Sequence, residues 1–403
     1  MKIIQANKFY FQKGGAEKYM LNLSSWLEAQ GNEVVPFAMS HPDSIQTPHK
    51  LFFPSFVYTE KTSLGWQGIR TMNRMLYSGE AKRKMRKLIK STKPDICHVH
   101  NIYTQLSPSI LSALQARKVP VVMTVHDHHL ISPQYNIWAS GCGEDYRKVG
   151  LFGAMRSRFH KGSAIASLAQ TAAYKFHRMF GMYRNNVDVF ICPSQYMKRQ
   201  LVHGGFPQEK LRVIPYGIES HHVEPRYDHD GYFLFVGRLS EEKGVDTIIR
   251  AAKILEDVPL KIVGTGPQSA WLHKLAHGHE NIEFLGYRSG KELEDLYRGA
   301  TALLLPSRVH ENAPLVALEA MTHGTPVIAS DVGGVSEIVM DRQTGILVDP
   351  VDLDAWTESI LRIYHDSELH GELAHASRWR VERHFSEADH YKAILGTYNQ
   401  LVN

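Results

Sequence analysis

Short apolar blocks alternate with amphipathic ones along the first half of the chain. Six segments are apolar almost throughout: KIIQA, EVVPFAM, PDICHVH, VPVVMTVH, NVDVFICPS and LRVIPYGI. Such segments are typical of strands that are buried on both faces. Helices are predicted between them over 16–30, near 107–117 and from about 195. The first of these helices ends at Gly31 and carries an apolar stripe of Ala16, Met20, Leu23 and Leu27. The pattern predicts a parallel sheet covered by helices on both faces.

The same alternation restarts after Pro215 and Gly217, which break the pattern before a polar stretch at 219–231. The expected strands are YFLFVGRL, LKIVGTG, IEFLGY, TALLLPS, TPVIAS and GILVDP, with helices between them and amphipathic helices from about 354. We therefore predict two α/β domains, 1–217 and 218–384. Ligands bind at the carboxyl ends of parallel strands, so two such sheets facing each other would line one cleft.

Composition agrees with two folded domains. The 403 residues are 43% hydrophobic and 22% charged, and no run reaches 18 apolar residues. The opening segment MKIIQANKFYFQKGG resembles a strand and a turn more than a signal peptide. Cys97, Cys142 and Cys192 are widely spaced and offer no disulfide framework, so we expect a cytoplasmic protein.

Positive charge is concentrated in two stretches of a chain whose net charge is +5. Residues 61–95 hold ten Lys or Arg against two acids, and residues 147–184 hold eight against none. The second stretch also holds Phe152, Phe159, Phe176, Met179 and Phe180. Basic and aromatic residues together favour a membrane surface, an anionic lipid-linked substrate or nucleic acid, and two solvated helix faces are the alternative. Because no nucleic-acid-binding motif is found, nucleic acid ranks below the membrane.

Two carboxylates lie in the segment PSRVHENAPLVALEAMTHGTPVIAS. Asn312 is predicted to cap a helix whose first turn contains Pro314, and the N–H groups of 313–316 would then form an anion site. Glu311 precedes this helix and Glu319 lies inside it, about 12 Å apart along a helical path. That separation suits a sugar, two phosphates and a ribose. The alternative is a cap and an ordinary helix glutamate.

Two cations follow a strand in FVGRLSEEKG. Arg238 ends the strand and Lys243 lies in the next turn, with Gly237 and Gly244 opening the backbone. They could neutralise a diphosphate leaving group, or they could be surface ion-pairing residues. Gly264 and Gly266 in GTGP form a glycine turn and Tyr287 follows a strand in FLGYRS. Both are weak signals of donor binding, and for GTGP a tight βα turn is the alternative.

The first half offers a further candidate site. Gly14 and Gly15 precede a helix, where backbone N–H groups could approach a phosphate. His126 and Asp127 end a buried strand, and the run of polar residues 126–129 indicates a site rather than a core. His126 could touch a transferred sugar. Alternatively, a metal cluster could form from His98, His100, His126, Asp127, His128 and His129, although their spacing fits known metal motifs poorly.

These motifs together resemble the retaining glycosyltransferases of family 4, which have the GT-B fold. The resemblance rests on GG before the first helix, HD after a middle strand, GR…KG, and the two glutamates before GTPVIAS. It covers nearly the whole chain and is most specific in ENAPLVALEAMTHGTPVIASDVGGVSEIV. HVHN and HDHHLISP are similar to members that build bacterial surface polysaccharides and glycolipids.

The resemblance implies two Rossmann-like doubly wound domains facing across a cleft, with a C-terminal helix from about 385 to 403 crossing back to the first. It implies transfer from a UDP- or GDP-sugar to a lipid-linked or saccharide acceptor. By similarity, Arg238 and Lys243 hold the pyrophosphate, Glu311 the sugar hydroxyls and Glu319 the ribose. The remaining positions implied are His126 near the reacting carbon, Gly15 near a phosphate, and the backbone of Asn312, Ala313, Pro314 and Leu315 near the phosphates. Members often have Phe-Gly where this chain has Asn312-Ala313, which leaves the sugar open.

The implied mechanism is same-face attack with retention, in which the departing diphosphate helps to remove the acceptor proton. No D-x-D motif follows a strand, so we expect no metal or other cofactor. A GT-B epimerase or phosphorylase and a non-catalytic nucleotide-sugar-binding module are the alternatives. We expect the protein in the cytoplasm or peripherally on the inner face of the membrane.

Overall fold

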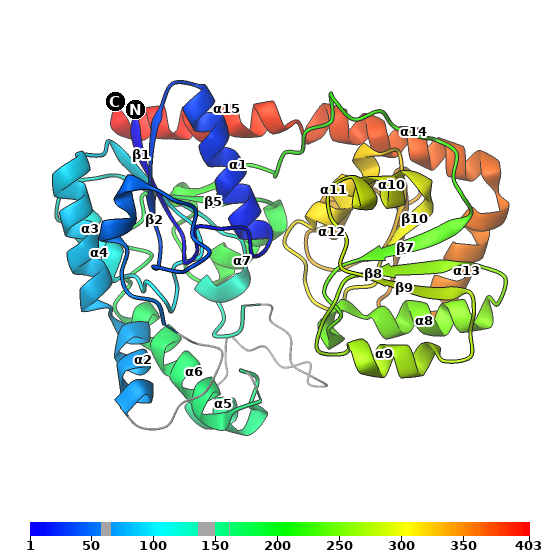
Figure 1. Ribbon diagram of the computed structural model, residues 1–403, viewed down its shortest axis with the longest axis horizontal. Helices are drawn as coiled ribbons and strands as arrows, with labels where there is room; N and C mark the ends of the chain where they lie inside the picture. The colour runs from blue at the N-terminus through cyan, green and yellow to red at the C-terminus, as the bar shows by residue number, and fades with distance from the viewer. Residues whose placement is uncertain (58–65, 136–149, 161) are drawn as a thin grey trace. The chain divides into compact units, whose positions relative to one another are not determined.

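The computed structural model describes residues 1–57, 66–135, 150–160 and 162–403. The chain forms two compact units (Figure 1). Unit 1 contains Met1–Ile214 and Tyr391–Asn403, and unit 2 contains Pro215–His390. In the part of the chain that is described, no helix is both long and apolar enough to cross a membrane.

The sheet of unit 1 has six parallel strands in the order β2-β1-β3-β4-β5-β6. The strands are β1 (Lys2–Ala6), β2 (Glu33–Phe37), β3 (Ile96–Val99), β4 (Val121–Thr124), β5 (Val189–Cys192) and β6 (Leu211–Val213). The helices are α1 (Gly15–Ala29), α2 (Trp66–Leu76), α3 (Gly79–Thr92), α4 (Ser109–Gln115), α5 (Leu151–Ser157), α6 (Ala164–Met179) and α7 (Gln195–His203). Each strand lies within a predicted apolar segment, because residues buried on both faces leave no room for alternation.

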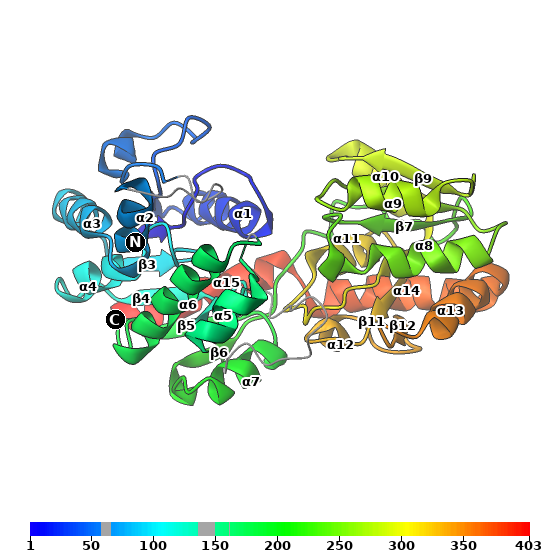
Figure 2. The same ribbon diagram turned by 90° about the horizontal axis from the view of Figure 1, so that it is seen from below.

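The sheet of unit 2 also has six parallel strands, in the order β12-β11-β10-β7-β8-β9. The strands are β7 (Tyr232–Val236), β8 (Leu260–Val263), β9 (Ile282–Gly286), β10 (Ala300–Leu305), β11 (Val327–Ser330) and β12 (Gly345–Val348). The helices are α8 (Val245–Ile254), α9 (Ser269–Ala276), α10 (Lys291–Gly299), α11 (Leu315–Thr322), α12 (Val335–Ile338), α13 (Leu353–His365) and α14 (Ser367–His384). Helices α8 and α9 lie on one side of the sheet, and α10 and α11 on the other (Figures 1 and 2). The predicted fold class, two doubly wound parallel sheets, is confirmed.

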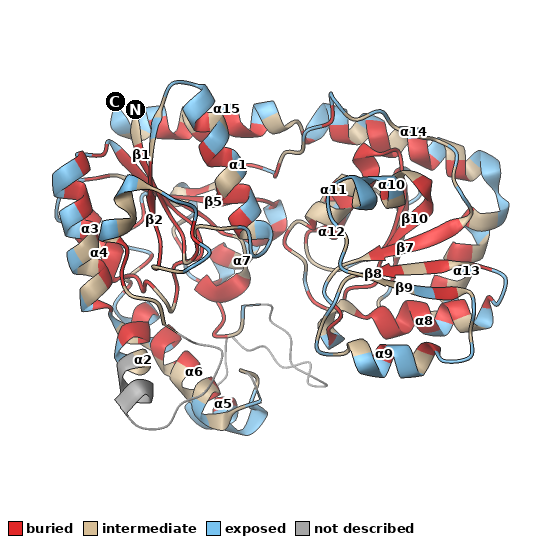
Figure 3. Ribbon diagram, in the orientation of Figure 1, coloured by how far each residue is buried: buried red, intermediate tan, exposed pale blue. Residues whose placement is uncertain are grey.

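Each unit has its own apolar core around its sheet, and Figure 3 shows the strands buried beneath helices whose outer faces are exposed. In α1, the predicted stripe residues Met20, Leu23 and Leu27 are buried. In unit 2, Phe233 and Phe235 on β7 belong to one buried cluster with Trp356 of α13. Burial of such apolar side chains is the main term that stabilises each unit.

The strand order of each sheet reverses once, and this reversal locates the expected ligand edge. In unit 2 the chain continues from β7 to β8 and β9 on one side, then returns to place β10, β11 and β12 on the other. In unit 1 the corresponding reversal lies between β1 and β3. Loops diverge at such a point, so the carboxyl ends of the two adjacent strands leave a crevice that ligands use.

The C-terminal helix α15 (Glu387–Val402) begins in unit 2, and its residues from Tyr391 onward belong to unit 1. Near its start the chain passes close to Gly217, where an added Cβ would lie 2.5 Å from the Cα of Glu387. Farther along, Tyr391 contacts Trp26, and Tyr398 is fully buried beside His98. Side chains of α15 are therefore part of the buried interior of unit 1.

Candidate active site

The two carboxyl ends at the switch point of unit 2 carry three of the predicted catalytic residues. Arg238 and Lys243 follow β7, and Glu311 follows its neighbour β10. Lys243 Nζ lies 2.6 Å from Glu311 Oε1, and Ser307 Oγ donates to the same oxygen at 2.6 Å. Both charged side chains are half-buried, whereas Arg238 is exposed. Two motifs 68 residues apart in sequence thus meet as one polar group.

Gly244 allows these two loops to approach. Its φ is +65°, and an added Cβ would lie 2.0 Å from the Pro306 carbonyl oxygen. Beside it, Arg308 N–H donates to the Glu242 carbonyl at 2.9 Å, and the Arg308 guanidinium donates to Asp246 Oδ2 at 2.7 Å. The sequence analysis missed the Arg308–Asp246 pair, because neither residue belongs to a recognisable motif.

Helix α11 begins later than predicted. Pro314, with extended backbone, is the residue before the helix, and its carbonyl accepts from the Ala317 N–H at 3.1 Å. The prediction that Asn312 caps the helix is therefore wrong. A proline at the cap position leaves no side chain to bond the first N–H groups, whereas Asn312 is buried in the preceding loop. The helix dipole still points its positive end toward this loop.

Glu319 lies on α11 and is fixed by a tyrosine that the sequence analysis missed. The Tyr297 hydroxyl donates to Glu319 Oε2 at 2.9 Å. Burial and the neighbouring Glu319 carboxylate raise the pKa of Tyr297 well above its ordinary value, so the phenol keeps its proton. Tyr297 lies on α10, and the sequence pattern predicted the helix but no role for this side chain.

The predicted glycines of the donor side pack against one another. An added Cβ on Gly264 would lie 1.8 Å from the Gly237 carbonyl oxygen, and one on Gly266 would lie 2.1 Å from that of Leu239. Backbone bonds join the same loops, from Gly237 N to Val263 O and from Leu239 N to Thr265 O. These glycines hold the loop of Arg238 against the loop after β8. Tyr287 is exposed after β9, the edge strand, two strands away from β7.

The loop that carries Glu311 is closed from a third side. The Gly334 N–H donates to the Glu311 carbonyl at 2.7 Å, and Gly333 has φ +65° with an added Cβ only 2.2 Å from the same oxygen. The DVGG segment after β11 therefore fixes the backbone of Glu311. The sequence analysis did not assign this role, although a Gly-Gly pair after a strand is the signal that could have found it.

In unit 1, His126 is held by a chain of buried polar groups. Its Nε2 lies 3.0 Å from His100 Nδ1, and His100 Nε2 lies 2.8 Å from Gln5 Oε1. Since the Gln5 carbonyl oxygen only accepts, His100 Nε2 donates a hydrogen bond to it. His100 Nδ1 therefore carries no proton and accepts a hydrogen bond from His126 Nε2. Burial, together with His98 and His126, holds the pKa of His100 well below its usual value, which keeps it neutral. His126 is thereby fixed in orientation after β4.

The remaining polar residues of this region do not form a metal cluster. His98 bonds the Tyr398 hydroxyl and Thr124 Oγ1 at 2.5 and 2.8 Å. Within residues 1–57, 66–135, 150–160 and 162–403, no group of His, Cys, Asp and Glu side chains could hold a metal ion. His128 and His129 are buried, so the prediction that the whole run 126–129 faces a site is wrong for these two. Both lie in a short helical turn, and Asp127 Oδ1 accepts from the His129 N–H at 2.9 Å.

The predicted donor-side residue Gly15 begins α1 and is exposed.

Comparison with known proteins agrees with this architecture. A family model described as Glycosyltransferase Family 4 matches residues 13–222, and one described as Glycosyl transferases group 1 matches residues 218–380. The glycogen synthase of Mycobacterium tuberculosis is 26% identical over 406 residues, which cover 92% of this chain and 87% of that protein.

Solved structures share the fold across the whole chain. Sucrose-phosphate synthase from Thermosynechococcus elongatus matches with a TM-score of 0.72 and 21% identity, covering 99% of this chain and 98% of that one. HepE of Anabaena, solved with UDP-glucose, matches with a TM-score of 0.70 and 18% identity, covering 99% and 100%. The fold and the family matches define a glycosyltransferase with the GT-B fold. The chain belongs to glycosyltransferase family 4.

Proposed function

We propose that the enzyme transfers a sugar, with retention at the anomeric carbon, from a UDP- or GDP-sugar to a lipid-linked or saccharide acceptor. The observation that carries the proposal is the Lys243–Glu311 pair beside the start of α11 at the β7/β10 switch point. A cation, a carboxylate and a positive helix end in one crevice suit a ligand that joins sugar hydroxyls to a diphosphate.

In the proposed reaction, Arg238 and Lys243 bind the pyrophosphate, and the first N–H groups of α11 add their positive ends. Glu311 accepts hydrogen bonds from the donor sugar, while Glu319, oriented by Tyr297, binds the ribose hydroxyls. The weaker assignments stay proposals: Gly15 and Gly237 near phosphates, the Asn312–Leu315 backbone near the diphosphate, and Gly264, Gly266 and Tyr287 near the nucleoside.

The chemical step exchanges two bonds on one face of the sugar. The bond from the anomeric carbon to the phosphate oxygen breaks, and the acceptor oxygen bonds the same carbon from the same side. The acceptor proton passes to the departing phosphate oxygen. Arg238, Lys243 and the helix N–H groups stabilise the charge on the leaving group, which is the largest electrostatic contribution available at this site. His126, fixed by His100, is assigned to the neighbourhood of the reacting carbon.

Relatives support a nucleotide sugar and a polysaccharide role. HepE of Anabaena was solved with UDP-glucose, and a relative of similar length is a glycogen synthase. We propose that this enzyme serves bacterial polysaccharide or glycolipid synthesis from the cytoplasm, peripherally bound to the inner face of the membrane.

The decisive experiment is a panel of UDP- and GDP-sugars scored first by the melting temperature. A donor at one hundred times its Kd stabilises the fold by about 2.7 kcal/mol, which identifies it directly. The selected donor is then incubated with saccharide and lipid-linked acceptors, and the anomeric configuration of the product is read by NMR. Release of free sugar and nucleotide without any acceptor would favour an epimerase. Donor binding without turnover would favour a binding module, and an inverted product would overturn the retaining assignment.

We also propose that transfer needs no metal ion, because no D-x-D motif follows a strand. Activity should be unchanged after dialysis against EDTA, measured as product formed at saturating donor. Loss of activity that only added Mn²⁺ restores would contradict this proposal.

A further inference from the structure

Helix α6 has its polar and apolar faces reversed with respect to an ordinary surface helix. Its buried side chains are mostly polar: Ser167, Gln170, Thr171, Tyr174 and His177, together with Ala173. Its outward stripe is mostly apolar, with Ile165 and Met179 exposed by 60% and 73% and Ala169, Ala172 and Phe176 half-buried between them. A surface helix normally shows the opposite arrangement.

The inward polar face is accounted for by its hydrogen bonds. Gln170 donates to His129 Nδ1 at 3.4 Å, and Ser167 Oγ accepts from the His160 N–H at 2.9 Å. His177 Nε2 donates to the Leu76 carbonyl of α2 at 2.9 Å. These bonds fix which side of α6 faces unit 1, so the apolar stripe cannot rotate inward.

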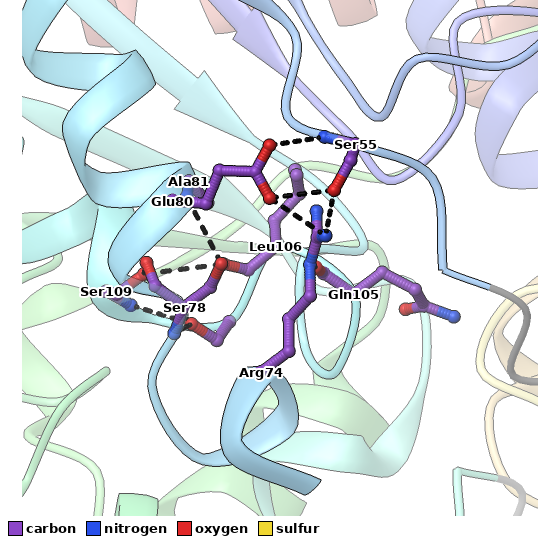
Figure 4. A network of polar contacts seen from close by, with 9 residues as sticks. Ser55, Arg74, Ser78, Glu80, Ala81, Gln105, Leu106 and Ser109 are labelled. Atoms are coloured by element: carbon purple, nitrogen blue, oxygen red, sulfur yellow. Dashed lines mark hydrogen bonds and ion pairs between the residues drawn. The ribbon is translucent and has the colours of Figure 1, made fainter. Parts of the chain in front are cut away.

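Helix α2, against which α6 packs, is itself fastened to the body of unit 1. Figure 4 shows Arg74 near the end of α2 bonded to three groups. Its Nη1 lies 3.0 Å from Ser55 Oγ and 3.3 Å from Glu80 Oε2, and its Nε donates to the Gln105 carbonyl at 3.0 Å. Because α6 is bonded to α2 and α2 to the body of unit 1, the apolar stripe of α6 has a fixed outward direction.

Helix α5 packs on α6 (Figure 1) and carries exposed apolar side chains of its own. Of its seven residues only Ala154 is buried, while Leu151, Phe152 and Met155 are exposed, Phe152 by 79%. Phe180, directly after α6, is exposed by 56%. We call this surface the α5–α6 face; its apolar members are Leu151, Phe152, Met155, Ile165, Met179 and Phe180. Clustered exposed apolar side chains of this kind mark an interaction surface.

The charge of the α5–α6 face is entirely positive. Arg156, Arg158 and Lys175 are exposed on it, and residues 147–184 contain no Asp or Glu. The other basic stretch behaves differently. Helix α3 buries Met85, Leu88 and Ile89 and exposes four basic residues to water, as a solvated helix does: Arg83, Arg86, Lys87 and Lys90. Of the described helices in the two basic stretches, α5 and α6 combine outward cations with outward apolar side chains, whereas α3 does not.

We propose that the α5–α6 face docks on a lipid bilayer that contains anionic phospholipids. The apolar side chains enter the region between headgroups and acyl chains, while the Arg and Lys side chains bond lipid phosphates. A second copy of the chain is a poorer occupant, because two wholly cationic faces repel each other. The proposal rests on the proposed function only in that a lipid-linked acceptor is reached at this surface; docking itself requires no substrate.

The test is flotation of the full-length protein with vesicles of phosphatidylcholine, alone or mixed with an equal amount of phosphatidylglycerol. The wild type should float with the mixed vesicles and far less with phosphatidylcholine alone. The double variant Phe152→Ser/Met179→Ser should bind the mixed vesicles at least about tenfold more weakly than the wild type, because two apolar side chains no longer leave water on docking. Arg156→Gln/Arg158→Gln should weaken binding mainly at low salt.

Matched controls lie in unit 2. Val351→Ser/Trp379→Ser removes exposed apolar area, and Lys274→Gln/Lys291→Gln removes two exposed charges; both should float as the wild type does. Equal flotation of wild type and Phe152→Ser/Met179→Ser would overturn the proposal. So would a concentration-dependent dimer, seen by light scattering without vesicles, that this variant abolishes. Donor-induced stabilisation tests the proposed function separately, so docking can fail while the enzyme assignment holds.

Discussion

At the scale of single residues, the central observation is that one carboxylate oxygen of Glu311 accepts from both Lys243 and Ser307. An ion pair that is half-buried holds its geometry better than a fully exposed pair. Lys243 is therefore pre-positioned between a carboxylate and the place assigned to the diphosphate. Such pre-organisation lowers the reorganisation needed when charge develops on a leaving group.

Lys243→Ala should reduce kcat by roughly a hundredfold or more, because it removes a fixed cation from the leaving group. The melting temperature should change little by comparison, since the pair lies at the edge of the unit. Lys274→Ala removes an exposed lysine of the same unit and should leave turnover unchanged. Full activity of Lys243→Ala would remove this residue from the mechanism.

Tyr297→Phe tests whether Glu319 must be oriented. The variant keeps the ring but loses the 2.9 Å bond to the carboxylate. We expect the KM for the donor to rise roughly fivefold, about 1 kcal/mol, while kcat stays within twofold, because one hydrogen bond of that size is lost from binding. Steady-state kinetics over a donor series measure both. An unchanged KM would show that Glu319 needs no help from Tyr297, or that it does not bind the ribose.

Local patterns in the sequence could indicate the candidate site residues but not the residues that hold them in place. Lys243 and Glu311 were found because a strand end and a helix start can be read from the sequence nearby. Tyr297 and Arg308 were not found, since each acts through a partner 22 or 62 residues away. His128 and His129 were wrongly assigned to the site because a polar sequence does not say whether its partners are water or buried groups.

At the scale of elements, the site depends on how closely the loops after β7, β8, β10 and β11 approach one another. Gly244, Gly264 and Gly333 each lie where backbone atoms of another loop leave no room for a Cβ. The loops therefore form a single packed layer over the strand ends. A change in one loop moves the others, since packed atoms transmit displacement.

Gly244→Ala should destabilise unit 2 by roughly 3 kcal/mol, because it combines a positive φ with a clash at the Pro306 carbonyl. Gly278→Ala is the matched control. Gly278 has φ +84° but open space around it, so only the conformational cost of about 1 kcal/mol applies. Urea denaturation of both variants measures the difference. Equal destabilisation of the two variants would mean that the loop after β10 moves away from the added Cβ at no cost in free energy.

The elements themselves were largely predictable. Apolar runs located all the strands because parallel strands buried on both faces leave the clearest signal in a sequence. The start of α11 was wrong because Asn and Pro each have several favourable positions near a helix start, and only the backbone of Pro314 decides between them. The reversed faces of α6 could not be recognised, since the partners of its polar side chains come from other elements.

At the scale of the whole molecule, buried neutral histidines make stability depend on pH. Burial lowers the pKa of His323, His370 and His390 to about 4. In the unfolded chain each titrates near 6.5. The unfolded state thus binds more protons between these values, so the stability due to neutral histidine is present above about pH 6.5 and is lost as the pH falls toward 4.

Unit 2 should therefore be less stable at pH 5 than at pH 7, by on the order of 2 kcal/mol for each of these histidines. Urea denaturation at the two pH values, followed by tryptophan fluorescence, measures the loss. His390→Gln should reduce the pH dependence, because glutamine can still donate to the Pro215 carbonyl without titrating. A pH dependence identical to that of the wild type would contradict the role of His390.

The assignment of residues 391–403 to unit 1 has a consequence for biosynthesis. Tyr398 supplies the buried hydroxyl that bonds His98, so unit 1 lacks part of its interior until α15 has been translated. Unit 2, continuous from Pro215 to His390, suffers no such delay. Unit 1 is consequently begun before unit 2 and completed after it, and nascent chains stalled before α15 should remain sensitive to protease in unit 1.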